Sequence, residues 1–302
     1  IKEINQIQNS RHAFSVMQWN TLARCCAIPA HHPKASQEHL NFEYRKELIA
    51  QEIRSYQADI ICLEEVDSRD LEFFQWILDA KEYGHNYAKK NSSYDGSLLL
   101  YRKKYELVET ETFSHYESDN QTKMNQVFQV TTLRYNAADN SVIYLVVTIV
   151  HLKAGPLNRW TRKRQTSQVA EILAYKKDQY LKIPGMKEDN IGIIVCGDFN
   201  EVPNTSPIQQ LTENKSLNLN SLFDDAKYTV YHIFGLIMGI TLPFGITLPY
   251  KDVVDFVLYS PNLFPTKKVL PPTDEEVGPN GLLSGHYPSD HLSLYCEFSF
   301  AN

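Results

Sequence analysis

Residues 191–200 read Ile-Gly-Ile-Ile-Val-Cys-Gly-Asp-Phe-Asn, an apolar run that ends in Gly197-Asp198-Phe199-Asn200. A short run of this kind, rich in β-branched residues and closed by a Gly-Asp pair, predicts a buried strand and a turn. Near the other end of the chain, Ser289-Asp290-His291 precedes the last apolar run. Together the two strings place carboxylates, a carboxamide and an imidazole at predicted strand ends. Chemistry on a phosphate ester needs such groups to hold a hard cation and to orient a nucleophile.

The overall composition is that of an ordinary globular chain, with 302 residues of which 43% are hydrophobic. No Pro/Gly/Ser-rich linker divides it, so we expect a polar N-terminal extension over residues 1–13 and one domain over 14–302. A net charge of -6 argues against a globally basic nucleic-acid-binding surface. It does not exclude a nucleic acid substrate, because carboxylates that hold a metal ion no longer present a negative local field.

The cysteines show no CxxC spacing, and three of the five lie inside apolar runs. This pattern is typical of reduced, buried thiols in an intracellular protein, and it favours neither disulfides nor a zinc site. We therefore expect an intracellular, cytoplasmic location. The chain starts at Ile1 without an initiator methionine, which indicates a fragment, so an upstream targeting segment is not excluded.

The pattern of apolar residues predicts helices alternating with strands early in the chain and strands that pair with each other later. This succession is typical of an α/β sandwich. Helices are expected over residues 42–56, 70–79 and 159–180. Strands are expected over residues 14–19, 59–63, 97–101, 127–133, 142–150, 191–196, 253–259 and 292–300.

One segment, residues 228–250, breaks this pattern because it carries no formal charge when His232 is neutral. Its Gly-Ile-Thr-Leu-Pro sequence occurs twice, at 239–243 and 245–249. The length suits a membrane span, but the glycines and prolines argue against a straight helix. We expect an apolar hairpin or loop at the rim of the site. A contact of residues 233–250 with a partner protein or a membrane surface is the second interpretation, and a true span is the least favoured.

Several polar residues directly follow predicted strands, where an α/β fold exposes functional side chains. Glu65 is the best candidate for a Mg²⁺ ligand, because Mg²⁺ is commonly held by one carboxylate, substrate oxygens and waters. A carboxylate at the start of a helix is the alternative. Asn20 would offer its carboxamide oxygen to the same ion or orient Glu65, unless it is simply a turn residue.

Asp198 and Asn200 lie two residues apart, so in extended geometry their side chains point to the same side. One would align the attacking water while the other donates to a phosphoryl oxygen. The alternative is a Gly-Asp turn in which Asn200 is the second member and has no catalytic role. His151 and Lys153 have the same spacing and would place two donors against the charge of the transition state.

His291 offers a base or a cationic donor next to Asp290, a second candidate metal ligand. An imidazole of this kind needs its other ring nitrogen fixed. Asp255, on the predicted strand over 253–259, is the natural carboxylate partner.

The ordered motifs of the chain resemble those of the endonuclease/exonuclease/phosphatase superfamily. They are Trp19-Asn20, Glu64-Glu65-Val66-Asp67, Asp95-Gly96, His151-Leu-Lys-Ala154, Gly197-Asp198-Phe-Asn200 and Ser289-Asp290-His291. The flanking sequences are similar to those of nocturnin and the carbon catabolite repressor type deadenylases. These flanks are Val16-Met-Gln-Trp-Asn-Thr-Leu-Ala23, Lys123-Met-Asn-Gln-Val127, Val277-Gly-Pro-Asn280 and Tyr287-Pro-Ser-Asp-His-Leu-Ser-Leu294. The resemblance extends from Phe14 to Phe300.

This resemblance implies a four-layer α/β sandwich, in which two central β-sheets are flanked by helices, with Mg²⁺ held at Glu65 and Mn²⁺ as a substitute. It implies that Asp198 aligns the nucleophile, that Asn200 and His151 contact the scissile phosphate, and that Asp255 pairs with His291. Asn20 would support the first metal ion and Asp290 a second one. Substrate contacts are implied for Lys153, Asn125, Gln126 and Thr229.

The chain departs from the family pattern at three places. Glu64 stands where the family has Gln and would add a charge beside the site, and Gly155 stands where animal nocturnins have Arg. The apolar segment 233–250 replaces a basic loop of those proteins. The chain thus lacks both the Arg and the basic loop of those proteins, which would bind an additional phosphate. Their absence weakens the expectation of a phosphatase that removes the 2′-phosphate of NADP(H).

The favoured function is therefore a Mg²⁺-dependent 3′–5′ exoribonuclease that acts on the 3′ ends of poly(A) or other RNA and releases AMP. The alternatives are the NADP(H) phosphatase, whose substrate is an adenine dinucleotide, and a lipid phosphodiesterase at a membrane surface. A degenerate member used as a binding module is the least favoured.

Overall fold

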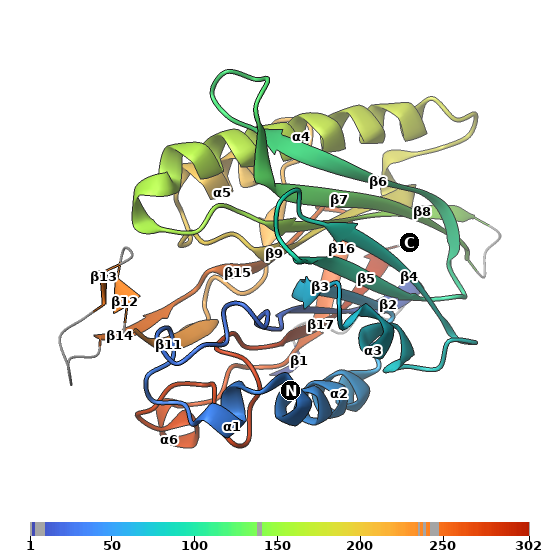
Figure 1. Ribbon diagram of the computed structural model, residues 1–302. Helices are drawn as coiled ribbons and strands as arrows, with labels where there is room; N and C mark the ends of the chain where they lie inside the picture. Colours follow the sequence, from blue (N-terminus) through green and yellow to red (C-terminus); the bar gives the residue numbers. More distant parts are fainter. Residues whose placement is uncertain are drawn as a thin grey trace.

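The computed structural model describes residues 2–3, 10–137, 141–234, 236–237, 240–241 and 248–301. Two β-sheets pack face to face, and helices lie on the outer side of each (Figure 1). Helix, sheet, sheet and helix thus form four successive layers, which confirms the fold class predicted from the sequence.

The first sheet has seven strands with one parallel pair, β2 beside β3, among antiparallel neighbours. In spatial order the strands are β1 (Lys2–Glu3), β16 (Leu263–Lys268), β17 (Leu294–Ala301), β2 (Ser10–Asn20), β3 (Ile60–Asp67), β5 (Asp95–Arg102) and β4 (Tyr83–Lys89). The parallel pair matters for function, because it brings the carboxyl ends of β2 and β3 to the same edge.

The second sheet has six strands, again with a single parallel pair, β8 beside β9. Its order is β10 (Asn220–Ser221), β15 (Asp255–Tyr259), β9 (Ile191–Asp198), β8 (Val142–His151), β7 (Lys123–Asn136) and β6 (Glu106–Tyr116). The register pairs His151 with Asp198, the last residues of β8 and β9.

The layers are held together by three apolar clusters. Between the sheets lie residues such as Phe14, Leu99, Leu145 and Val257 together with the free thiols of Cys62, Cys196 and Cys296. Helices α2 (Phe42–Tyr56) and α3 (Leu71–Trp76) pack on the outer face of the first sheet. Helices α4 (Arg159–Leu181) and α5 (Ser206–Thr212) pack on the outer face of the second. The short helices α1 (Gln37–Leu40) and α6 (Asp274–Val277) and the 3-10 turns at Pro156–Asn158 and Glu188–Asn190 complete the helical elements.

The expected elements are present, and the structure extends several of them. The first long strand starts at Ser10 and not at residue 14, and β3 continues to Asp67 through the acidic pair that sequence reasoning placed after the strand. Strands β4, β6 and β16 were not predicted. Strand β6 is mostly exposed and carries four glutamates or threonines in Glu109–Thr112, so it lacks the apolar run that marks a buried strand.

The uncharged segment forms hairpin ladders. Strand β11 (Val230–Phe234) pairs with β14 (Leu248–Asp252), and β12 (Leu236–Ile237) pairs with β13 (Ile240–Thr241). This confirms the expected hairpin for the described residues, while most of the repeated Gly-Ile-Thr-Leu-Pro sequence lies outside them. Among the described residues, no helix has the length and apolar character needed to cross a membrane. A contact of this segment with a partner or a membrane surface stays a prediction.

Candidate active site

The candidate site lies where the two parallel strand pairs end. Asn20 closes β2, and His151 and Asp198 close β8 and β9, while β2 packs against β9 across the two sheets. Gly197 permits the close pairing of β8 and β9, because a Cβ at this position would lie 1.9 Å from the Val150 carbonyl oxygen. Glycine is therefore required for Asp198 to lie beside His151.

Glu65 is placed by an irregularity in β3. The pairing of β3 with β5 shifts register between Leu63 and Val66, and Glu65 has a left-handed backbone with φ 57°. A bulge with such a residue redirects a side chain out of the regular alternation. Glu65 Oε2 accepts a hydrogen bond from the Ala23 amide at 2.8 Å. Burial alone would raise the pKa of Glu65, but the Lys90 ammonium and the Ala23 amide favour the carboxylate and lower it.

Asn20 connects two carboxylates of the site. Its Nδ2 donates to Glu65 Oε1 at 3.1 Å and to Asp198 Oδ2 at 3.2 Å, while its Oδ1 accepts from the Leu22 amide at 3.1 Å. Of the two roles considered for Asn20, the structure therefore displays the orienting one. The carboxamide oxygen faces the backbone and not the carboxylates.

Asp198 is the centre of the site. Its Oδ2 lies 3.7 Å from His151 Nε2 and 3.9 Å from His291 Nε2, and both distances exceed a hydrogen bond. Burial raises the pKa of the Asp198 carboxyl even though both imidazoles oppose this effect. A buried carboxylate of raised basicity, facing two imidazoles, suits a base that receives a proton from water.

The expectation that Asp198 and Asn200 extend to the same side is wrong in its geometry. Strand β9 ends at Asp198, and Asn200 adopts a left-handed conformation with φ 50°. The Asn200 amide donates to Asp198 Oδ1 at 2.8 Å, and its Nδ2 donates to the Leu152 carbonyl at 3.2 Å. The turn considered as the alternative is thus present, and it fixes one oxygen of Asp198.

The two histidines differ in their surroundings. His151 Nε2 lies 3.9 Å from Glu65 Oε1, and burial together with the Lys90 ammonium lowers the pKa of His151. His291 Nδ1 lies 2.9 Å from Asp255 Oδ2, the contact that the sequence predicted. Burial alone would lower the pKa of His291, but the nearby carboxylates, Asp255 above all, raise it well above its ordinary value. One site thus holds a weakly basic and a strongly basic imidazole.

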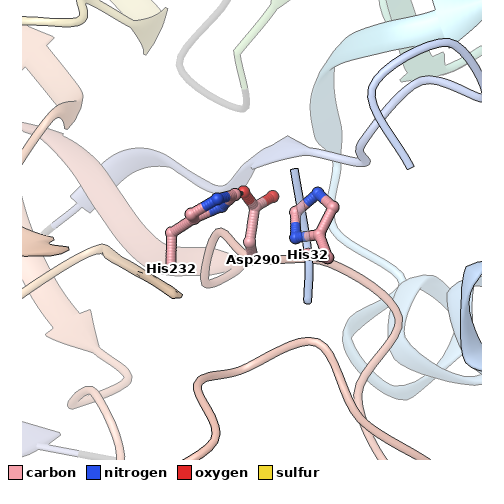
Figure 2. A group of neighbouring side chains, drawn as sticks. All are labelled: His32, His232 and Asp290. Atoms are coloured by element: carbon pink, nitrogen blue, oxygen red, sulfur yellow. The ribbon is translucent and has the colours of Figure 1, made fainter. Parts of the chain in front are cut away.

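Asp290 does not join Asp198, Asp255 and His291 in their cluster of close ligand atoms. Its Oδ2 lies 2.7 Å from His232 Nδ1, and His32 lies on its other side (Figure 2). The second-metal role expected from the resemblance therefore has a different set of neighbours from the one around Asp198.

Glu64 lies in an environment that opposes the expected charge. Its side chain is fully buried, and its Oε2 accepts from Gln18 Nε2 at 2.8 Å. Burial raises the pKa of Glu64 well above its ordinary range, and the negative charge of Asp255 adds to this effect. This environment favours the protonated form of Glu64, which carries the same charge as the Gln that it replaces.

Sequence reasoning missed Lys90 and Gln18. Lys90 is half-buried with its Nζ 2.5 Å from Asp95 Oδ2, and its charge acts on both Glu65 and His151. Gln18 Nε2 bridges Glu64 to Asp255 Oδ1, the latter at 3.2 Å. Lys90 follows β4, which had not been predicted, and Gln18 lies inside a strand. Neither therefore stood at a predicted strand end.

The four residues expected to contact substrate have different surroundings. Lys153 follows β8 with a half-buried side chain, and its amide donates to Gln165. Thr229 is fully buried, and its hydroxyl accepts from the Val254 and Asp255 amides, so it positions Asp255 and presents no accessible atom to a substrate. Asn125 is likewise bonded to the Ser92 amide, which makes it a support of that loop. Gln126 is buried, and its Oε1 has no hydrogen-bond partner among the described residues.

Comparison with known proteins decides the family. The model of the Endonuclease/Exonuclease/phosphatase family matches residues 17–291. The chain belongs to this family. It is 31% identical to nocturnin of Mus musculus over 97% of the chain and 67% of that protein. It is 26% identical to the CCR4-Not complex 3′-5′-exoribonuclease subunit Ccr4 of Candida albicans, over 94% of the chain and 41% of that protein.

The solved structure of the human nocturnin catalytic domain with a bound sulfate anion superposes with a TM-score of 0.69. The identity is 27%, and the match covers 98% of the chain and 97% of that domain. Family membership and these relatives identify a hydrolase of phosphate esters that depends on a divalent metal ion.

Proposed function

We propose that the protein is a Mg²⁺-dependent 3′–5′ exoribonuclease that removes AMP from the 3′ end of poly(A). The observation that carries the proposal is the Asp198 cluster, by which we mean Asn20, Glu65, His151, Asp198, Asp255 and His291. It joins a carboxylate of lowered pKa, a carboxylate of raised pKa and two imidazoles where the ends of strands from both sheets meet. The similarity to the Ccr4 3′-5′-exoribonuclease subunit supports an RNA substrate.

The residues present fit a Mg²⁺ ion at Glu65. Its carboxylate is buried, its pKa is lowered, and Asn20 and Ala23 fix its orientation. Among the described residues Glu65 is not part of a compact group of three ligands, which suits an ion that keeps waters and takes one carboxylate. When bound, Mg²⁺ would neutralise charge on the phosphoryl oxygens and favour departure of the leaving oxygen.

The other residues of the Asp198 cluster divide the remaining work. Asp198 Oδ2 accepts a proton from the attacking water, because its raised pKa makes it the more basic carboxylate. His291, charged through Asp255, and the N–H of His151 donate to the phosphoryl oxygens as negative charge develops. Hydrolysis of the terminal phosphodiester then leaves AMP and an RNA chain shortened by one nucleotide with a free 3′-hydroxyl.

The test is incubation of the purified protein with oligo(A) and, separately, with NADP in the presence of Mg²⁺. We expect AMP from oligo(A) and little inorganic phosphate from NADP. Release of phosphate from NADP without AMP from oligo(A) would overturn the proposal in favour of the phosphatase alternative.

The metal assignment is tested with Glu65→Ala, which is expected to abolish Mg²⁺-dependent turnover. The matched control is Glu47→Ala, which removes an exposed glutamate of α2 and is expected to retain full activity. Undiminished activity of Glu65→Ala would refute Glu65 as the metal ligand.

A further inference from the structure

A second group of side chains able to hold a metal ion lies next to the Asp198 cluster and takes no part in the proposed hydrolysis. His32 comes from the chain between β2 and α1, His232 from β11, and Asp290 from the segment before β17 (Figure 2). One ligand atom from each lies within 4.8 Å of the others. All three residues are buried, with 5%, 7% and 7% of their surface exposed. We call them the His32 cluster.

The hydrogen bonds of His232 determine where its ring carries a proton. His232 Nε2 lies 2.9 Å from the carbonyl oxygen of His31, which only accepts hydrogen bonds, so Nε2 carries hydrogen. In a neutral imidazole the lone pair is then on Nδ1, and Nδ1 lies 2.7 Å from Asp290 Oδ2. Two acceptors at this distance share a proton, which a metal ion bound to both atoms would displace.

The rest of the cluster is arranged for a cation larger than a proton. Asp290 Oδ1 is buried and has no hydrogen-bond partner among the described residues, and a buried carboxylate oxygen is costly to leave in that state. The three side chains line a pocket of about 10 Å³, close to the minimum volume that one water or ion occupies.

His32 supplies a third donor. Its ring centroid lies 4.4 Å from that of His232. The His32 ring is buried beside the other two ligands, and a neutral imidazole offers the lone pair of one ring nitrogen to a metal ion.

We propose that His32, His232 and Asp290 bind one Zn²⁺ ion, at a site separate from the Mg²⁺ site of the proposed function. Two imidazoles and a carboxylate are a ligand set typical of zinc, with a fourth position open to water. Mg²⁺ prefers oxygen ligands and would bind at Glu65 instead. The bond from His232 Nε2 to a backbone carbonyl is the contact that commonly orients a zinc-bound histidine.

Such an ion would connect three separate segments beside the catalytic centre. It would hold the loop that carries His32 and strand β11 against Asp290, whose neighbour in the chain is His291. The amide of Tyr231 already donates to the Asp290 carbonyl at 3.0 Å, so zinc would reinforce an existing contact. Its expected effect is on stability and on the position of His291.

The experiment measures zinc content, which does not depend on turnover. Glu65→Ala protein is the parent, so that the catalytic metal ligand is absent, and it is treated with chelator and then dialysed against Zn²⁺. Elemental analysis is expected to give one more zinc ion per chain in this parent than in the Glu65→Ala/His32→Ala double variant. Zinc is expected to raise the melting temperature of the parent and to leave that of the double variant unchanged.

His31→Ala in the same parent is the matched control, because its half-buried ring bonds to the Cys26 carbonyl and its own backbone carbonyl survives the change. It is expected to retain the zinc ion. His32→Asn serves as a second variant if His32→Ala unfolds. Equal zinc content in parent and His32 variants, or no zinc in the parent, would overturn the proposal and leave a protonated His232 paired with Asp290. Neither result touches the exoribonuclease proposal, which the assay on oligo(A) tests independently.

Discussion

The Asp198 cluster and the His32 cluster meet at two consecutive residues of the chain. His291 belongs to the Asp198 cluster, and Asp290 belongs to the His32 cluster. The Asp198 cluster is rich in carboxylates, and its members Asn20, His151, Asp198 and Asp255 stand at the ends of strands in both sheets. The His32 cluster is rich in imidazole and is assembled from connecting segments and a hairpin strand. Strand pairing thus fixes most of the first set, whereas the second set depends more on connecting segments. This difference predicts that the Asp198 cluster binds Mg²⁺ and the His32 cluster Zn²⁺. It also predicts that mutations in the first lower turnover, whereas mutations in the second lower stability.

Substitution of Asp198 is the most severe test of the difference between the two clusters. Asp198→Asn removes the basic carboxylate and is expected to lower kcat for AMP release by about 10³- to 10⁴-fold, while zinc binding at the His32 cluster is kept. Single-turnover kinetics on oligo(A) measure the first effect and elemental analysis the second. Asp178→Asn, on the exposed side of α4, is the control and keeps full activity. A loss of less than tenfold in Asp198→Asn would remove Asp198 from the role of base.

The next largest effect is expected at His151. His151→Ala removes a donor that faces Glu65 and Asp198, and we expect a loss of about 10²- to 10³-fold in kcat. His32→Ala, by contrast, is expected to lose stability more than turnover. The measurement compares kcat and melting temperature for both variants, with the exposed His286→Ala as control. Equal losses of kcat at His151 and His32 would erase the distinction between the clusters.

Asp255→Asn is expected to change the pH profile of activity. Asp255 raises the pKa of His291, so His291 stays protonated as the pH rises through neutrality. Without this carboxylate the pKa of His291 falls, and the proton is lost at lower pH. Activity should therefore decline by about tenfold for each pH unit above the lowered pKa. Rates between pH 6 and pH 9 measure this shift, and an unchanged alkaline limb would show that the charge of His291 is not needed.

The smallest effect concerns Glu64, the carboxyl that is buried next to the charged Glu65. Its pKa is raised in the folded protein, so its contribution to stability is present at acidic pH and is lost as the pH rises above its unfolded value near 4.5. Glu64→Gln should remove this loss, which is at most about 1.4 kcal/mol per pH unit. Urea unfolding at pH 4.5 and pH 7.5 measures it, with Glu47→Gln as control. A lower stability of Glu64→Gln at pH 7.5 would mean that Glu64 is ionised in the folded protein.

The sequence predicts well those parts of the molecule that local pattern determines. The buried runs identified β3, β5, β7, β8, β9 and β15, and helix α2 has the predicted bounds. Glu65, His151 and Asp198 follow or close such runs and His291 precedes the last one, so their convergence could be anticipated. The pairing of Asp255 with His291 followed from the order of the motifs.

Other parts depend on features that spacing does not reveal. The bulge that redirects Glu65 and the left-handed turn at Asn200 break the regular alternation on which the sequence argument relied. The raised pKa of Glu64 depends on its complete burial, and the hydroxyl of Thr229 already accepts hydrogen bonds from backbone amides. His32, His232 and Asp290 lie far apart in the chain, so cysteine spacing, which argued against zinc, had no bearing on a histidine site.

The face-to-face packing of the sheets has a consequence for how the enzyme can fail. Asn20 and Glu65 come from one sheet and His151 and Asp198 from the other, so each sheet holds only half of the site. A state in which both sheets are formed but slightly separated would keep its secondary structure and lose hydrolysis completely. Activity therefore reports the docking of the two halves, and loss of turnover marks their separation before any strand unfolds.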